Sequence, residues 1–410
     1  MKKFFALLLS LAMVLALVAC GQKDPTPDTP DTPDDPQTKV EYKVAMITDY
    51  GDITDQSFNQ TTYEACKAFA EDNSIEFSYF KPAGDNTADR VAMIEKAVND
   101  GFNVIVMPGY AFGGAIVEAA PEFPDVKFIA LDVAAGDLLE TAVAKAGEAY
   151  DYTPENWDLN KYVDMSNVYC AVYQEELCGY MAGYAAVKLG YKNLGFLGGM
   201  SVPAVVRYGY GFVQGVDAAA ADLGLTDVKL NYIYGGQFFG DADITAVMDT
   251  WYQGGTEVVF ACGGGIYTSA VDAAKKANAK VIGVDVDQAG VIAKYAGVDG
   301  MTVTSAMKGL YPATYDTLTD VIVNGNWDKY VGKIATLGLV SGTDPEANYV
   351  QIPMGDGTQW SDSFTQDDYK AMVKDMFDGK ITVSNNTSSD VSAADFATVI
   401  TVDDQGSIKG

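Results

Sequence analysis

The stretch KFIALD, residues 127–132, recurs as KVIGVD at residues 280–285. Each is a short apolar run that ends in an aspartate, and other apolar runs correspond at a nearly constant offset of about 150 residues. The matching pairs are 43–49 with 193–199, 77–80 with 231–234, 103–107 with 257–261, and 127–132 with 280–285. A constant offset over these strand-like segments indicates that the chain contains one α/β unit twice.

Helix-like stretches separate the apolar runs in each copy, for example residues 58–73 and their counterpart 210–224. Strands buried on both faces and separated by helices predict a parallel sheet covered on each side. Because residues 40–410 are too many for one core of ordinary size, we expect two doubly wound parallel-sheet lobes joined by several crossovers. One large α/β sheet with accidental internal similarity is the alternative. A further strand-like run, Thr302 to Ser305, is expected to cross back to the first lobe.

Residues that directly follow the predicted strands are the first candidates for a binding site, because open parallel sheets bind ligands beyond the carboxyl ends of their strands. In the first copy these residues are Asp49 and Tyr50, Asp85, Pro108 to Tyr110, and Asp132; in the second they are Gly198 to Met200, Gly235 to Gln237, Cys262 to Gly265, and Asp285 to Asp287. Two lobes that close by hinge motion would bring these residues together in a cleft.

The loop DYGDITDQSFNQ, residues 49–60, offers stacking and hydrogen-bonding groups at the start of a helix. Either Asp55 or Ser57 can cap that helix. Phe58 comes early enough to face the cleft and stack on a flat ligand, and Asn59 has both a donor and an acceptor for the edge of a base. Phe58 can equally pack on its own helix as an N-terminal staple, so spacing leaves both roles open.

Asp132 and Asp285 end equivalent strands of the two copies. A carboxylate that accepts from two adjacent hydroxyl groups holds a vicinal diol, as in ribose or a hexose, through strong charge-assisted hydrogen bonds. An aspartate after a strand also often caps the next helix, but the symmetry of the pair favours the ligand site. Asp287 competes with Asp285 for this role, since it lies only two residues further on.

The run FACGGG, residues 260–265, places three glycines after a strand, where backbone amides can approach a ligand closely. It matches neither GxGxxG nor GxxxxGKS/T, so we expect Gly265 to contact a neutral ligand rather than a phosphate. Phe260 is either a second stacking ring or part of the strand core. Lys308 either offsets the carboxylates of the cleft and donates to ligand oxygens, or is an ordinary solvated lysine.

The composition argues against several functions. The formal net charge of −29 disfavours nucleic acid polymers as partners, because affinity for them comes largely from basic side chains on phosphates. The chain has no histidine, no CxxC pair and no GxSxG motif, so we expect no metal site, no cofactor and no catalytic residue. Besides Cys20 there are Cys66, Cys170, Cys178 and Cys262, which we expect to be buried free thiols.

The N-terminal residues have the pattern of an export signal. A positive start precedes an apolar stretch, residues 4–18, which is shorter than the roughly 20 residues that span a bilayer. The following LVAC resembles a bacterial lipobox, so we expect residues 1–19 to be removed and Cys20 to carry a lipid at the extracytoplasmic face of the cell membrane. Plain secretion is the alternative. Residues 20–39, with the run DPTPDTPDTPDDP, are expected to form an extended tether.

Several ordered segments carry a resemblance to a known family. They are GDITDQSFNQTTYEAC (51–66), EELCGYMAGYAA (175–186), LGFLGGMSVPAVVRYGYGFVQGV (194–216), VIGVDVDQ (281–288) and TSAMK (304–308). Over most of residues 43–385 the chain resembles the basic membrane protein family, also called purine nucleoside receptor-type lipoproteins. The resemblance implies a type I periplasmic-binding-protein fold and the receptor subunit of an ABC importer. A nucleoside ligand and permease and ATPase partners follow from it.

The family resemblance also implies roles for individual residues. Matched motif by motif, these are Phe58 and Asn59 against the base, Asp132 in the ligand shell, Asp285 on ribose hydroxyls, and Lys308 as a further polar contact. Phe260 is implied as the second aromatic ring, with Tyr267 as its competitor, and Asp49 as a residue that lines the cleft. The preferred base stays open, since Tyr110 and Phe112 add aromatic rings and residues 150–162 look like an insertion.

These observations predict a domain layout and a function. Residues 40–170 with about 300–330 are expected to form the N-terminal lobe, residues 171–299 with about 331–385 the C-terminal lobe, and 386–410 a polar extension. We expect a monomeric receptor that binds a nucleoside and delivers it to a membrane transporter, with a purine nucleoside as the first candidate ligand. A sugar receptor and a sensor that presents its ligand to a membrane kinase are the alternatives, with an enzyme third.

Overall fold

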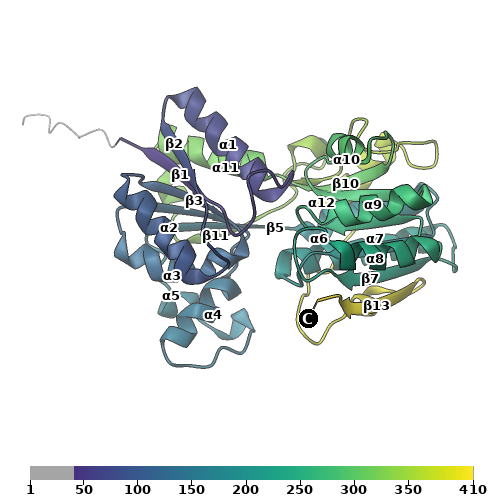
Figure 1. Ribbon diagram of the computed structural model, residues 1–410, viewed down its shortest axis with the longest axis horizontal. Coiled ribbons are helices and arrows are strands. Elements are labelled where there is room, and N and C mark those ends of the chain that lie inside the picture. The colour runs from purple at the N-terminus through teal and green to yellow at the C-terminus, as the bar shows by residue number, and fades with distance from the viewer. Residues whose placement is uncertain (1–40, 410) are drawn as a thin grey trace, which may run out of the picture. The chain divides into compact units, whose positions relative to one another are not determined.

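The computed structural model describes residues 41–409, and from Tyr42 onward the chain forms one compact unit. The predicted signal peptide, Cys20 and the tether lie outside the described residues. Two sheets organise the unit (Figure 1). The strands of the first sheet are β1 (Lys43–Ile47), β2 (Glu76–Phe80), β3 (Val104–Pro108), β4 (Lys127–Leu131), β5 (Val168–Tyr173) and β11 (Lys333–Leu337). Those of the second are β6 (Asn193–Gly198), β7 (Lys229–Tyr234), β8 (Val258–Cys262), β9 (Lys280–Asp285), β10 (Thr302–Lys308), β12 (Val350–Gln351) and β13 (Thr401–Ser407).

The strand orders confirm the internal repeat. The first sheet runs β11-β5-β4-β3-β1-β2, and the second runs β12-β10-β9-β8-β6-β7-β13. Each strand of the first sheet therefore has a counterpart at the same place in the second, and the correspondence extends two strands beyond the four that the sequence revealed, to β5 with β10 and to β11 with β12. All pairings are parallel except the short antiparallel contact between β10 and β12. The predicted α/β fold of two doubly wound lobes is confirmed.

Helices cover both faces of the first sheet, which explains why its strands are apolar without alternation. These helices are α1 (Phe58–Asn73), α2 (Thr87–Asn99), α3 (Gly113–Ala119), α4 (Ala135–Lys145), α5 (Leu159–Tyr162) and α11 (Leu310–Leu318). Val44 and Met46 of β1 pack with α1 and α11, whereas Ala45 and Ile47 pack with α2, α3 and α4. Successive side chains thus point to opposite faces, and both faces are buried.

The second sheet has the same layered build. Its helices are α6 (Glu175–Lys188), α7 (Pro203–Asp222), α8 (Ala242–Gln253), α9 (Tyr267–Ala277), α10 (Ala289–Ala296) and α12 (Gln366–Phe377). Phe196 and Phe260 belong to the core cluster under α6 and α7, whereas Leu197 and Val259 belong to the cluster under α8 and α9. The helix pair α6 and α7 packs closely at glycines: a Cβ at Gly211 would collide with the backbone of Glu176.

The predicted lobe boundaries need correction at the crossovers. The strand β10, expected to cross back to the first lobe, pairs with β9 inside the second sheet. The chain crosses only after it: α11 packs on α1, and β11 extends the first sheet beside β5. Residues 333–337 therefore belong to the first lobe, although they were expected in the second. An apolar run marks a buried strand but does not say which sheet it joins.

The polar extension expected at residues 386–410 contains a strand. The strand β13 pairs in parallel with β7 and forms the edge of the second sheet. Its sequence TVDDQGS is polar because most of its side chains are exposed, and polar side chains are common on edge strands. The extension is therefore part of the second lobe.

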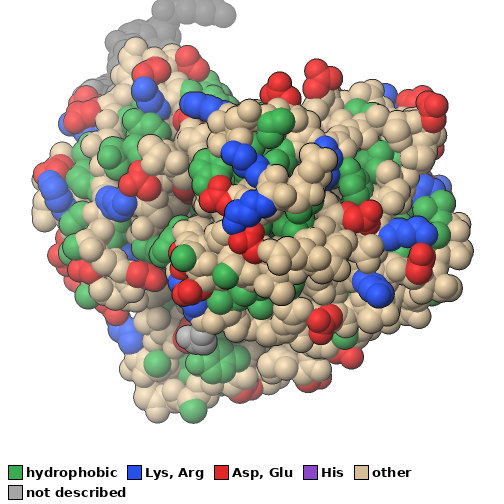
Figure 2. All heavy atoms as spheres, turned by 45° about the vertical axis from the view of Figure 1, so that its right-hand side comes forward, with side chains coloured by type: hydrophobic (Ala, Val, Ile, Leu, Met, Phe, Trp, Pro, Cys, Tyr) green, Lys and Arg blue, Asp and Glu red, His purple; other side chains and the backbone are tan. Residues whose placement is uncertain are grey.

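Two further properties concern the described residues. The four cysteines from Cys66 to Cys262 are buried free thiols, as predicted. No helix between residues 41 and 409 combines the length and apolarity needed to cross a bilayer. The face drawn in Figure 2 carries acidic and basic side chains interspersed with apolar ones, as expected for a well-solvated surface.

Candidate ligand-binding site

A cavity lies where residues from the strand ends of both sheets meet. Its empty space is about 880 Å³, a volume that includes the open mouth of the cavity. Of the residues predicted from the sequence, the cavity is lined by Asp49, Phe58, Asn59, Asp132, Asp285 and Lys308. These side chains lie far apart in the sequence but close together in the fold, as expected from the rule that ligands bind beyond the carboxyl ends of parallel strands.

The loop before α1 is ordered by Asp55, which caps the helix. Its carboxylate accepts from the backbone amides of Ser57 (2.9 Å), Asn59 (2.9 Å) and Gln60 (3.1 Å). The Asn59 side-chain amide donates to Asp55 (3.1 Å) and to Asp49 (3.2 Å). The Oδ1 atom of Asn59 is buried and has no partner within the described part of the chain. Since buried acceptors are normally hydrogen-bonded, this atom is available to a donor on a ligand.

Asp132 and Asp285 share an uncommon backbone conformation, with φ angles of 59° and 65°. Side chains other than glycine rarely adopt this left-handed region, and aspartate tolerates it better than most. Neither residue caps the next helix: Asp137 accepts from the amide of Ala134 at the start of α4, and Asp287 accepts from that of Ala289 in α10. The equivalent strands therefore both turn at an aspartate whose carboxylate is left for another purpose, and a strained residue of this kind is typical of functional sites.

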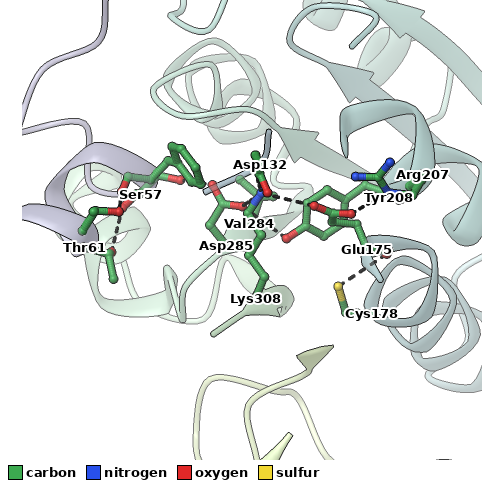
Figure 3. A network of polar contacts seen from close by, with 12 residues as sticks. Ser57, Thr61, Asp132, Glu175, Cys178, Arg207, Tyr208, Val284, Asp285 and Lys308 are labelled. Carbon is green, nitrogen blue, oxygen red and sulfur yellow. Dashed lines mark hydrogen bonds and ion pairs between the residues drawn. The ribbon is translucent and has the colours of Figure 1, made fainter. Parts of the chain in front are cut away.

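Lys308 is the centre of a buried charge network (Figure 3). Its ammonium group lies 2.5 Å from Asp132 of the first lobe, 3.4 Å from Glu175 and 3.7 Å from Asp285 of the second. Only 4% of the Lys308 side chain is exposed, and Glu175 is fully buried. Burial lowers the pKa of Lys308, but the three carboxylates outweigh burial and raise it overall, so the lysine stays charged. The alternative of a solvated lysine is excluded.

Asp132 keeps one oxygen free within this network. Its Oδ2 atom accepts from Lys308, whereas Oδ1 is buried without a partner among the described residues. Burial raises the pKa of Asp132 to about 6, and the nearby lysine limits the rise. The carboxyl is thus mostly ionised at neutral pH and can accept a hydrogen bond from a ligand.

Asp285 joins the two lobes directly. Its carboxylate accepts from the Ser57 hydroxyl of the first lobe at 2.6 Å and from the Tyr208 hydroxyl of α7 at 3.2 Å. Ser57 thus bonds across to the second lobe, while Asp55 caps the helix. Asp287, the competitor from the sequence, is exposed and does not line the cavity.

Three residues of this network were missed from the sequence. Glu175 begins α6, and Arg207 and Tyr208 lie in the first turns of α7; the Arg207 Nε atom donates to Glu175 at 2.7 Å. Apart from Glu176, which follows Glu175, both helices are mostly apolar at this end, because they are buried on nearly all sides. Two adjacent acids in one apolar helix and a single arginine in another are the available signal, since buried charges occur in pairs.

The aromatic lining differs from the prediction. Phe260 is fully buried in β8 and packs edge-on against Phe196, with ring centroids 5.4 Å apart, so it takes the strand-core role. Tyr267 packs against Tyr295, also away from the cavity. Alternation along β8 points the Phe260 side chain at α7 rather than past the strand end.

Besides Tyr208 of α7, the second lobe lines the cavity with the ring of Phe238, in the loop after β7. Its centroid lies 6.2 Å from that of Tyr50 in the first lobe. Gly265 is also outside the cavity lining: its amide donates to the carbonyl of Phe238 at 2.9 Å, and so supports this loop. The strand-end residues predicted from the sequence end at Gln237, one residue before Phe238.

Asp137 is a further cavity carboxyl, and it predicts a pH dependence. Burial raises its pKa to about 7, far above that of an aspartate in an unfolded chain, so the folded state binds the extra proton. Its contribution to stability therefore falls as the pH rises from about 4 to about 7. We expect Asp137→Asn, which keeps the hydrogen bond to Ala134, to gain stability relative to the wild type as the pH is raised from 5 to 8.

Chemical denaturation at several pH values measures this difference. The exposed Asp356→Asn substitution is the control for the change of carboxylate to amide, and should show no such trend. A stability difference for Asp137→Asn that does not change with pH would contradict the assignment.

Between residues 41 and 409 there is no group of histidine, cysteine, aspartate or glutamate side chains that could hold a metal ion. The acidic cavity is instead balanced by Lys308 and Arg207, which lie against its carboxylates. The geometry is suited to binding a polar organic molecule.

Comparison with known proteins assigns the family. Residues 42–345 match the model of the Bmp family, described as ABC transporter substrate-binding protein, PnrA-like. The chain belongs to this family. This match confirms the resemblance seen in the motifs, and it assigns the chain a substrate-binding role in ABC transport.

Individual relatives agree with the family assignment. The chain is 25% identical to the ABC transporter nucleoside-binding protein BmpA of Lactococcus lactis over 389 residues, covering 92% of this chain and 96% of the relative. An uncharacterized lipoprotein of Pyrococcus abyssi is 26% identical over 320 residues, covering 74% and 69%. A solute-binding protein of an ABC transporter system from Aeropyrum pernix has the same fold, with a TM-score of 0.60 at 20% identity over 84% of this chain and 88% of that one.

Proposed function

We propose that this member of the Bmp family binds a nucleoside between its two lobes and delivers it to an ABC importer. A purine nucleoside is the first candidate ligand. The observation that carries the proposal is the pair Asp132 and Asp285, which end equivalent strands in the same left-handed conformation and line one cavity. Two carboxylates that approach from opposite lobes suit the vicinal hydroxyl groups of a ribose. The Lactococcus relative is named a nucleoside-binding protein, which supports the same ligand class.

The remaining lining suits a base. Phe58 contributes a ring from the first lobe and Phe238 one from the second, and neither ring carries a hydroxyl that would need a partner. A flat heterocycle stacked between two such rings gains about 1–3 kcal/mol for each contact. The free Oδ1 atom of Asn59 can accept a hydrogen bond from a ring N–H or an amino group of the base.

The charge of the cavity favours a neutral ligand over a phosphorylated one. Its lining carboxylates outnumber its basic side chains, and both basic side chains, Lys308 and Arg207, are already paired with acids. A nucleoside monophosphate would bring two negative charges next to these carboxylates without a free cation to meet them. We therefore expect discrimination against nucleotides.

Transport needs release as well as binding. Within residues 41–409 the chain passes between the sheets after β5, after β10 and after β11. Three connections between two lobes are suited to a hinge motion that opens the lobes around a central ligand. A monomer anchored through Cys20, with a permease and an ATPase as partners, completes the proposal.

A ligand panel tests the proposal. Calorimetric titration of the chain from residue 41 onward, one compact unit, should give binding with nucleosides and none with the free base, ribose, hexoses or nucleoside monophosphates at the same concentrations. Ring and diol must be in one molecule to reach both Phe58 and Asp285.

A hexose receptor is the second candidate, because paired carboxylates and aromatic rings also suit sugars. Binding of a hexose without binding of any nucleoside would select it. Binding of a nucleoside monophosphate as tight as that of its nucleoside would contradict the argument from charge.

A further inference from the structure

The end of the chain, residues 398–409, is tied to the second lobe although it lies beyond the residues that match the family model. We call these residues the C-terminal strap. Asp217 of α7 holds its start: the carboxylate accepts from the amides of Thr398 (2.8 Å), Val399 (2.8 Å) and Ile400 (3.2 Å). The strap then forms β13 along β7, so its course is set by both a side-chain anchor and a strand pairing.

The far end of the strap reaches the loop between β7 and α8. The Ile408 amide donates to the Tyr234 carbonyl at 2.8 Å, at the point where β7 ends. The Lys409 ammonium group donates to the Gln237 side chain at 3.0 Å and forms an ion pair with Asp241. Gly236 allows this approach: it has φ of 80°, and a Cβ there would lie 2.7 Å from the Lys409 backbone oxygen.

The residues that Lys409 holds lie on both sides of Phe238. Gln237 precedes it, and the Gln237 side-chain amide donates to the Phe239 carbonyl (2.9 Å) and to Asp241 (3.0 Å). Lys409, Gln237 and Asp241 thus form one hydrogen-bonded group around the loop. Phe238 lines the cavity within this loop, where no helix or long strand fixes its position.

We propose that Lys409 of the C-terminal strap is a positioning residue for Phe238, and so sets how well the second aromatic wall fits the base. The inference rests on the proposed nucleoside function, in which Phe238 stacks on the ligand. A site held within a fraction of an ångström depends on such supporting contacts, since a loosely held ring gives up part of its stacking energy. Lys409 itself is not in the cavity lining, so its effect must pass through the loop.

A double-mutant cycle tests the proposal in the full chain, with guanosine and inosine as probes. We expect Lys409→Ala to weaken binding about twofold to fivefold, as for loss of a partly exposed ion pair, and Lys409→Arg to bind like the wild type. Phe238→Ala should weaken binding about tenfold or more. The double variant should bind no more weakly than Phe238→Ala alone, because Lys409 acts through that ring. The control, Lys380→Ala, removes another lysine paired with an aspartate and should change nothing.

Either of two results would overturn the proposal: unchanged affinity in Lys409→Ala, or losses that simply add in the double variant. Hydrogen exchange of the ligand-free chain separates this test from that of the proposed function. Lys409→Ala should speed exchange in residues 235–241 several-fold, and Lys380→Ala should not. If the wild type binds no nucleoside, the proposed function fails, and the exchange result alone decides whether the strap holds the loop.

Discussion

Replacing Lys308 by methionine is expected to lower the free energy of unfolding by about 3–5 kcal/mol at neutral pH, the usual cost of removing one partner from a buried charge pair. Methionine keeps much of the volume of the side chain but leaves Asp132, Glu175 and Asp285 without their common cation. Arg207 still pairs with Glu175, so the uncompensated charge falls on the two aspartates of the proposed ligand site. Nucleoside binding should be lost together with stability.

The loss in free energy of unfolding caused by Lys308→Met should also depend on pH. Without the lysine the pKa of Asp132, already raised to about 6, rises further, and protonation at low pH relieves the repulsion. The stability difference from the wild type should therefore be smaller at pH 5 than at pH 8. Chemical denaturation at both pH values measures it, with the exposed Lys380→Met as control. A variant as stable as the wild type at pH 8 would contradict the central role of Lys308.

Asp285→Asn is expected to weaken nucleoside binding about 100-fold or more, since two hydrogen bonds to a charged acceptor contribute about 1.5–3 kcal/mol each. Asparagine is a sharper probe than alanine at this position. It tolerates the left-handed backbone of Asp285, with φ of 65°, so the substitution changes charge and hydrogen bonding rather than conformation.

The matched control for Asp285→Asn is Asp287→Asn, two residues further on. Asp287 is exposed and accepts from the Ala289 amide, outside the cavity lining, so its variant should bind within about twofold of the wild type. Calorimetric titration with the same nucleoside measures both. Equal losses in the two variants, or binding by Asp285→Asn within about threefold of the wild type, would rule out Asp285 as the ribose acceptor.

Much of the fold could be predicted because the internal repeat is recognisable from its short apolar strand segments. KFIALD and KVIGVD mark equivalent strands, and the strand-end rule then leads to Asp132, Asp285 and the loop with Phe58. What a local pattern does not contain is the partner of each strand. The strand Thr302–Lys308 has the same apolar pattern whichever sheet it joins, so the sequence alone predicts the crossover one element too early.

The parts of the site that the sequence did not reveal depend on contacts distant in the chain. Glu175 and Arg207 meet because α6 and α7 pack closely, and neither helix indicates the other as its neighbour. Phe260 lies within the apolar strand β8, and Phe238 lies in the glycine-containing loop after β7. Only the direction of each side chain in the folded protein separates a core ring from a cavity ring. The strap was missed for the opposite reason: its polar sequence resembles a free tail, while its backbone pairs with β7.

Calorimetric titration of the wild-type chain with nucleosides, and in parallel with hexoses, tests the central claim most directly. The account predicts one nucleoside bound per chain with micromolar or tighter affinity, and no heat of binding from a hexose. Binding of a hexose without binding of any nucleoside would contradict it.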